Sequence, residues 1–148
     1  DAIKVFQAQS ASKEIRLTAQ LQAGLSLIKC DAGILEQILT NLWINACDAL
    51  QETGGDVRIS TRYVADRNEV LLCIEDTGPG IPEQILDQIF DPFFTTKEVG
   101  KGTGLGLAVV YGFINELGGR IEVESHERTR FNIYFPIAEE QQGQVLNE

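Results

Sequence analysis

Residues 76–106 read DTGPGIPEQILDQIFDPFFTTKEVGKGTGLG and carry the strongest functional signal in this chain. Six glycines form two clusters that flank an aromatic, lysine-containing segment: Gly78 and Gly80 in the first, and Gly100, Gly102, Gly104 and Gly106 in the second. Glycine clusters let the backbone approach a ligand closely and direct its N–H groups toward anionic oxygens. This stretch therefore predicts a site for a phosphate-bearing ligand.

A helical segment upstream, NLWINACDAL, supplies a second polar feature. Asn41, Asn45 and Asp48 share one helix face, separate from the apolar stripe, and would line a cleft. An asparagine oxygen is a suitable neutral ligand for a hard cation such as Mg²⁺. Together with the glycine clusters, these residues predict a site for a nucleotide triphosphate with Mg²⁺.

The composition narrows the function classes. The 148 residues suit one globular domain, and their net charge of −10 argues against nucleic acid, which proteins bind through basic patches. Backbone amides, a metal ion and local lysines must then neutralise bound phosphates. Three widely spaced cysteines predict free thiols rather than a zinc site. No apolar run approaches the ~20 residues of a membrane helix, and the start shows no signal-peptide pattern.

The hydrophobic pattern predicts an α+β fold, a two-layer sandwich with a mixed, mostly antiparallel sheet and about three helices on one face. Strands are expected at residues 15–19, 25–29, 57–64, 69–75, 120–124 and 131–135, the last four as two hairpins. Helices are expected at 1–12, over about twenty residues from Asp31, after Pro82, and at 103–117, the last largely buried. The helix from Asp31 buries Leu35, Ile38, Leu39, Leu42, Ala46, Ala49 and Leu50. Residues 91–102 are expected to form a flexible loop.

Two common phosphate-binding loops do not fit. A Walker loop requires G-x-x-x-x-G-K-[ST], but Gly102 follows Lys101, and position 95 is Thr. A dinucleotide fingerprint beginning at Gly100 or Gly102 has a leucine where its third glycine belongs. A loop that leads into a helix N-terminus, itself an anion site, remains.

Four motifs in fixed order resemble the boxes of sensor histidine kinases. Residues 41–49 resemble the N box, 76–82 the G1 box, 90–97 the F box and 102–107 the G2 box. The resemblance spans about residues 14–136 and is closest to the nitrogen-regulator-like and PAS-linked hybrid branch. It implies the Bergerat fold with a flexible ATP lid, a linker helix at 1–13 from an upstream dimerisation domain, and a polar tail at 137–148.

The resemblance also implies roles for individual residues. Asn45 would bind Mg²⁺, Asn41 would face the phosphates or the metal's water shell, and Lys97 would reach a phosphate. Asp76 would accept a hydrogen bond from the adenine amino group. Further nucleotide contacts would come from Gly78, Gly80, Ile81, Phe90, Thr96, Lys101, Gly102, Thr103, Gly104, Leu105, Gly106 and Thr129. Simple core packing is the competing interpretation for Phe90, and a solvated charge that for Lys101.

Two departures from the family pattern bear on function. The segment around Thr129 runs SHERTRF, and the loop before Thr129 is about two residues shorter than the family's glycine-rich loop. Gyrase-type ATPases place a water-activating Glu four residues before the metal-binding Asn, where this chain has Asn41. The chain's only histidine, His126, lies between two predicted strands, where no phosphoacceptor helix fits.

The resemblance therefore implies a protein-histidine kinase catalytic domain. It would use ATP and Mg²⁺, phosphorylate a histidine on a separate dimerisation domain, and act with a response-regulator receiver domain in a homodimeric protein. Its location would be cytoplasmic, either free or as part of a membrane-anchored sensor. A gyrase- or mismatch-repair-like ATPase and a catalytically silent nucleotide-binding docking module are the alternatives.

Overall fold

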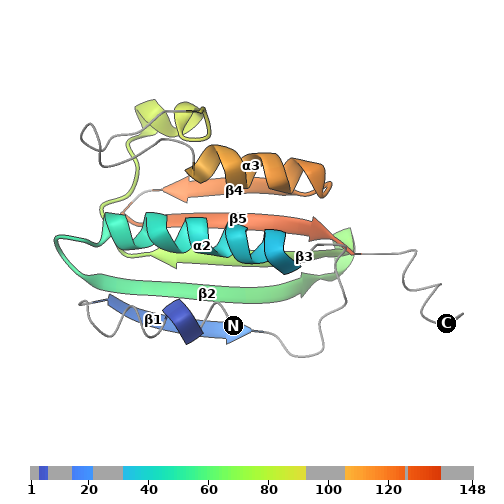
Figure 1. Ribbon diagram of the computed structural model, residues 1–148, viewed down its shortest axis with the longest axis horizontal. Helices are drawn as coiled ribbons and strands as arrows, with labels where there is room; N and C mark the ends of the chain where they lie inside the picture. The colour runs from blue at the N-terminus through green and yellow to red at the C-terminus, as the bar shows by residue number, and fades with distance from the viewer. Residues whose placement is uncertain (1–3, 7–14, 22–31, 93–105, 126, 138–148) are drawn as a thin grey trace, which may run out of the picture.

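The computed structural model describes residues 4–6, 15–21, 32–92, 106–125 and 127–137 (Figure 1). Residues 4–6 are helical. The elements that follow are β1 (Ile15–Leu21), α2 (Ala32–Ala49), β2 (Gly55–Val64), η1 (Ala65–Arg67), β3 (Glu69–Asp76), η2 (Glu83–Gln88), α3 (Gly106–Glu116), β4 (Arg120–Ser125) and β5 (Thr129–Pro136). The predicted strand at 25–29, residues 93–105 and the tail from 138 lie outside the described residues.

The strands form one five-stranded sheet in the order β1-β2-β3-β5-β4. β1 is parallel to β2, and the other neighbours are antiparallel. Both α2 and α3 lie on the same face of this sheet, α2 over its centre and α3 beside β4 (Figure 1). The predicted α+β sandwich with a mixed, mostly antiparallel sheet is therefore confirmed.

The alternation of residues in β2 divides the two faces. Val57 and Ile59 are at most 1% exposed and point into the core, whereas Arg58 and Arg62 point to the other face and are exposed. Each fully buried aliphatic side chain of this kind contributes roughly 1.5–3 kcal/mol to folding. The sheet therefore has one apolar, helix-covered face and one polar face that no described helix covers.

Helix α2 buries most of its predicted stripe and two residues more. Ile38, Leu42, Ala46 and Leu50 are at most 2% exposed, but Trp43 at 1% and Cys47 at 8% are buried as well. Phe6 covers Trp43, with ring centroids 4.9 Å apart and planes 16° from parallel. The buried face of α2 is wider than predicted, in part because Phe6 packs on Trp43.

The short helix predicted after Pro82 is present as the 3₁₀ helix η2. Another helical prediction differs from the structure. Helix α3 was expected to be largely buried, but only Val110 and Ile114 are buried within it. This expectation was wrong because α3 lies beside β4, the edge strand, so only one side of the helix faces the core. Among the described residues, no helix is long and apolar enough to cross a membrane.

Candidate functional site

The predicted site residues that the structure describes gather at one end of the sheet. The C-terminal part of α2, the end of β3 and the start of α3 meet there, next to the turn between β4 and β5 (Figure 1). Asp76 is the last residue of β3 and pairs with Val57 on one side and Thr129 on the other. Since Val57 points into the core, Asp76 and Thr129 also point to the helix-covered face.

Asp76 has the most unusual environment in this region. It is only 4% exposed, and its Oδ1 accepts a hydrogen bond from the backbone N–H of Gly78 at 2.9 Å. Burial raises the pKa of the Asp76 carboxyl, the Gly78 hydrogen bond lowers it, and the neighbouring Glu75 carboxylate raises it. No cation among the described residues pairs with Asp76, so this buried acceptor is suited to an N–H group from a ligand.

Gly78 allows the loop after Asp76 to lie directly against α2. A Cβ at Gly78 would be 2.9 Å from Asp76 Oδ1, 3.2 Å from Ala49 Cβ and 3.3 Å from the Ala49 carbonyl oxygen. Any side chain there would displace the carboxylate or the helix end. The next glycine, Gly80, adopts a φ of 83°, and a residue with a side chain would be strained in this conformation. Both glycines thus have a structural reason to be present.

Thr77 fixes the backbone at this point. Its N–H donates to the Asp56 carbonyl oxygen at 3.1 Å, and its Oγ1 accepts from the Asp56 N–H at 3.0 Å. This reciprocal pair holds the end of β3 to the start of β2. The adjacent Asp76 carboxylate therefore sits on a rigid strand end rather than on a loop, as precise recognition of a ligand requires.

The asparagines connect this strand end to α3. Asn41 Nδ2 donates to the backbone oxygen of Gly106, the first residue of α3, at 3.4 Å. Asn45 lies one turn later on the same half-buried face, and Ala49, beside Gly78, one turn later again. At a rise of 1.5 Å per residue, Asn41 and Ala49 are about 12 Å apart along α2. A face of this length, from a buried carboxylate to a helix N-terminus, suits an extended nucleotide.

The turn between β4 and β5 closes the other side of the site. Thr129 is 4% exposed and lies opposite Asp76 in the register, despite the shortened loop before it. Ser125 pairs with Thr129 across the turn, and its Oγ accepts a hydrogen bond from the backbone N–H of Ile81. The sequence analysis assigned no role at this site to Ser125, Thr77 or Ala49, because their roles arise from contacts between distant segments.

Phe90 packs among aromatic rings. Its ring stacks on Tyr111 at a centroid distance of 5.3 Å and meets Phe131 edge-on at 6.3 Å. These contacts join the chain after η2 to α3 and β5, which is the core-packing role that competed with nucleotide contact. Direct contact of Phe90 with a nucleotide stays a prediction.

The predicted lid residues cannot be placed in this site. Thr96, Lys97, Lys101, Gly102, Thr103, Gly104 and Leu105 lie outside the described residues, as does His126. Within the described ranges, no cluster of three or more His, Cys, Asp or Glu residues could hold a metal ion. The candidate metal-binding group there is the Asn45 amide, whose neutral oxygen fits Mg²⁺, since this ion keeps several waters and phosphate oxygens as ligands.

Comparison with known proteins identifies the family of this chain. The family model for the histidine kinase-, DNA gyrase B- and HSP90-like ATPases matches residues 30–139. The sensor kinase CckA of Brucella abortus is 40% identical over 90% of this chain and 16% of its own length. The sensory histidine kinase/phosphatase NtrB of Rhizobium leguminosarum is 32% identical over 95% of this chain and 40% of its own length.

A solved structure of a single domain matches most of this chain. The catalytic domain of histidine kinase ThkA, in a nucleotide-free form, is 30% identical with a TM-score of 0.79, over 91% of this chain and 87% of that one. The chain thus spans less than half of the two sensor kinases but most of a catalytic domain. It belongs to the histidine kinase-, DNA gyrase B- and HSP90-like ATPase family and, within it, to the catalytic domains of sensor histidine kinases.

Proposed function

We propose that this domain binds ATP with Mg²⁺ and positions the γ-phosphate for attack by a histidine on a separate dimerisation domain. That histidine then passes the phosphoryl group to an aspartate of a response-regulator receiver domain, within a homodimeric kinase. The observation that supports this best is the buried Asp76 carboxylate, which has one backbone hydrogen bond and no described cation. It lies at the end of a face that leads to the N-terminus of α3.

Asp76 would select adenine. With Oδ1 bound to the Gly78 N–H, Oδ2 is available to accept from the 6-amino group of adenine. Guanine carries an oxygen at this position, so two acceptors would face each other in a buried site. A site built to accept a hydrogen bond rejects a ligand that cannot donate one, because both groups are left unpaired. Thr129, beside Asp76, would contribute its hydroxyl to the same end of the nucleotide.

Asn45 and Asn41 would serve the phosphate end. Asn45 would hold Mg²⁺ through its side-chain oxygen, and the metal would neutralise phosphate charge when bound. Asn41 keeps the start of α3 beside α2 through its bond to Gly106. The N–H groups of the first turn of α3 would then face the phosphates, a favourable place for anions. Lys97 and Lys101 are the proposed cationic contacts from the lid.

Position 41 favours transfer to histidine over hydrolysis. An asparagine amide cannot take a proton from water, and this one already donates to Gly106. Catalysis would come from positioning and from charge stabilisation. The alternative, a hydrolysing ATPase, would require another base near the γ-phosphate.

The proposed domain boundaries follow the domain organisation of the family. We assign residues 1–13 to a linker from the dimerisation domain, 14–136 to the catalytic domain and 137–148 to a polar tail. The stacking of Phe6 on Trp43 supports a linker that packs on α2.

Two measurements with the purified domain test this proposal. Calorimetry should show ATP·Mg²⁺ binding and much weaker GTP binding, and radiolabelled ATP should phosphorylate a separately supplied dimerisation hairpin without labelling this chain. Asn45→Ala should lose most phosphotransfer but keep adenine binding. Fast ATP hydrolysis with no acceptor present would favour the ATPase, and equal binding of GTP would exclude the role of Asp76.

A further inference from the structure

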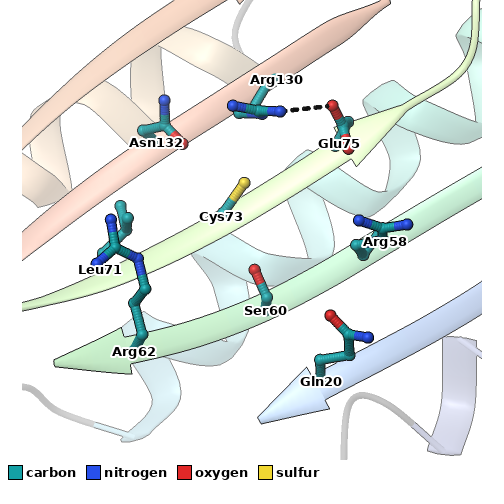
Figure 2. A pocket seen from close by; sticks show the side chains of 9 residues that line it. All are labelled: Gln20, Arg58, Ser60, Arg62, Leu71, Cys73, Glu75, Arg130 and Asn132. Carbon is teal, nitrogen blue, oxygen red and sulfur yellow. Dashed lines mark hydrogen bonds and ion pairs between the residues drawn. The ribbon is translucent and has the colours of Figure 1, made fainter. Parts of the chain in front are cut away.

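The face of the sheet opposite α2 and α3 carries a pocket of about 230 Å³ (Figure 2). Its residues come from β1, β2, β3 and β5, and β2 contributes Arg58, Ser60 and Arg62. The alternating sequence VRISTR puts these three side chains on the same face, because Val57 and Ile59 point into the core. The pocket therefore lies on a different face from the proposed nucleotide site.

The pocket is positively charged in an acidic chain. Three guanidinium groups line it against one carboxylate, that of Glu75, while the whole chain has a net charge of −10. Arg130 donates to Glu75 Oε2 at 3.0 Å, and Arg128 lies 3.6 Å from the same oxygen. That carboxylate is therefore already neutralised by its neighbours.

Arg58 and Arg62 are different. Both side chains are exposed, and neither forms an ion pair with any described residue. Uncompensated arginines on a strand face attract anionic groups, most strongly carboxylates and phosphates that match the guanidinium fork. This pair supplies the charge that a ligand would have to complement.

The spacing of the two arginines describes the ligand. Four residues along a strand correspond to about 13 Å. Figure 2 shows their side chains at opposite ends of the pocket, with Ser60 and Cys73 between them. A single compact anion would reach only one of them. Two carboxylates four residues apart on an extended polypeptide would reach both.

The polar lining of the pocket also suits a polypeptide. Gln20 and Ser60 offer side chains that can hydrogen-bond to a polar backbone, whereas the Asn132 amide already donates to Glu124. None of the nine residues that line the pocket is aromatic, so it lacks the stacking surface on which proteins hold nucleobases. The two sensor kinases compared above are also much longer than this chain, so domains outside it exist in such proteins.

We propose that this face is a docking surface for an extended acidic segment of a partner domain, which places two carboxylates against Arg58 and Arg62. The interaction is separate from the nucleotide site and does not depend on the proposed function. It is electrostatic and exposed, so it weakens as salt concentration rises.

A peptide titration followed by NMR tests the proposal. The probe is a peptide of about nine serine and threonine residues with two glutamates four residues apart. It should shift the backbone amide signals of Ser60 and Cys73. Arg58→Gln and Arg62→Gln should each weaken binding about three- to fivefold, as expected for an exposed ion pair. The matched control is Arg67→Gln, an exposed arginine in η1 outside the pocket, which should leave the affinity unchanged.

Three results would overturn the proposal. Equal binding of a peptide with adjacent glutamates, or an equal effect of Arg67→Gln, would mean unspecific charge attraction. Pyrophosphate that shifts the same amides and displaces the peptide at lower concentration would mean a small-anion site. If a chain that ends at Ile137 binds the peptide and the full chain does not, the polar tail of this chain itself occupies the pocket face.

Discussion

Glu75 and Asp76 are neighbours on β3, but their carboxylates lie on opposite faces of the sheet. Both residues are buried, at 7% and 4% exposure. Glu75, on the polar face, pairs with Arg128 and Arg130 at 3.6 and 3.0 Å. Asp76, on the helix-covered face, has one backbone hydrogen bond and no described cation. Burial alone therefore does not identify a binding group, but burial without a charged partner does.

The comparison has a thermodynamic meaning. A carboxylate that the fold already pairs contributes to stability, and its removal leaves its partners uncompensated. A buried carboxylate without a cation costs stability in the absence of a ligand, and a donor from the ligand reduces this cost. The two neighbouring residues should therefore respond oppositely to neutralisation, in ways that affinity and stability measurements can separate.

The largest expected effect is on nucleotide affinity. Asp76→Asn should weaken ATP binding about ten- to a hundredfold, because a charge-assisted hydrogen bond is worth about 1.5–3 kcal/mol. Calorimetry measures the affinity, and Asp66→Asn, in the exposed turn η1, is the matched control. Unchanged affinity in a folded Asp76→Asn variant would exclude adenine recognition by this carboxylate.

Neutralising Glu75 should act on stability instead. Glu75→Gln leaves Arg128 and Arg130 without their shared carboxylate and should lower the free energy of unfolding by about 1–2 kcal/mol. The expected loss of stability is moderate because both arginines are partly exposed to water, with side-chain exposures of 57% and 42%. Urea unfolding measures this change. ATP affinity should stay within about threefold, and a tenfold loss would contradict the separation of the two faces.

The pH dependence should reveal the cost of burying Asp76. Because burial raises the folded pKa of Asp76 above its ordinary value of 3.8, the folded state holds this proton more tightly than the unfolded state. Its contribution to stability is therefore present at low pH and is lost as pH rises from the unfolded to the folded pKa. Without nucleotide, Asp76→Asn should be more stable than the wild type at neutral pH, by on the order of 1 kcal/mol.

Thermal melts between about pH 4 and pH 8 measure this difference. The gap between Asp76→Asn and the wild type should widen with pH and then level off above the folded pKa. The Asp66→Asn control should follow the wild type throughout. A gap that is independent of pH would mean that the carboxylate is not penalised by burial.

Sequence periodicity predicted the parts of this molecule that depend on local pattern. Val57 and Ile59 alternate with polar residues, so the sequence pattern predicted both their strand and its buried face. The contact of Phe6 with Trp43 could not be predicted from local pattern, because it joins segments far apart in sequence. The apolar sequence of α3 misled for a related reason, since only its position beside an edge strand explains why it stays partly exposed.

The candidate site divides in the same way. Asp76 and its glycines were recognisable because their motif is local. The register that places Thr129 opposite Asp76 depends on how β5 pairs with β3 after a shortened loop, and no spacing in the sequence gives that. The hydrogen bond between Ile81 and Ser125 likewise joins residues 44 positions apart.

The smallest expected effect tests this last contact. Ser125→Ala removes the oxygen that accepts from the Ile81 N–H and leaves that donor partly buried without its partner. Because a neutral hydrogen bond is worth about 1 kcal/mol, the free energy of unfolding should fall by about this amount. ATP affinity should fall about two- to fivefold, because the loop at Ile81 is held less firmly beside the nucleotide. Ser60→Ala, on the open face, is the matched control and should leave ATP affinity unchanged. If both variants bind ATP like the wild type, the loop at Ile81 does not depend on the β4–β5 turn for its position at the nucleotide, and Asp76 alone defines that end of the site.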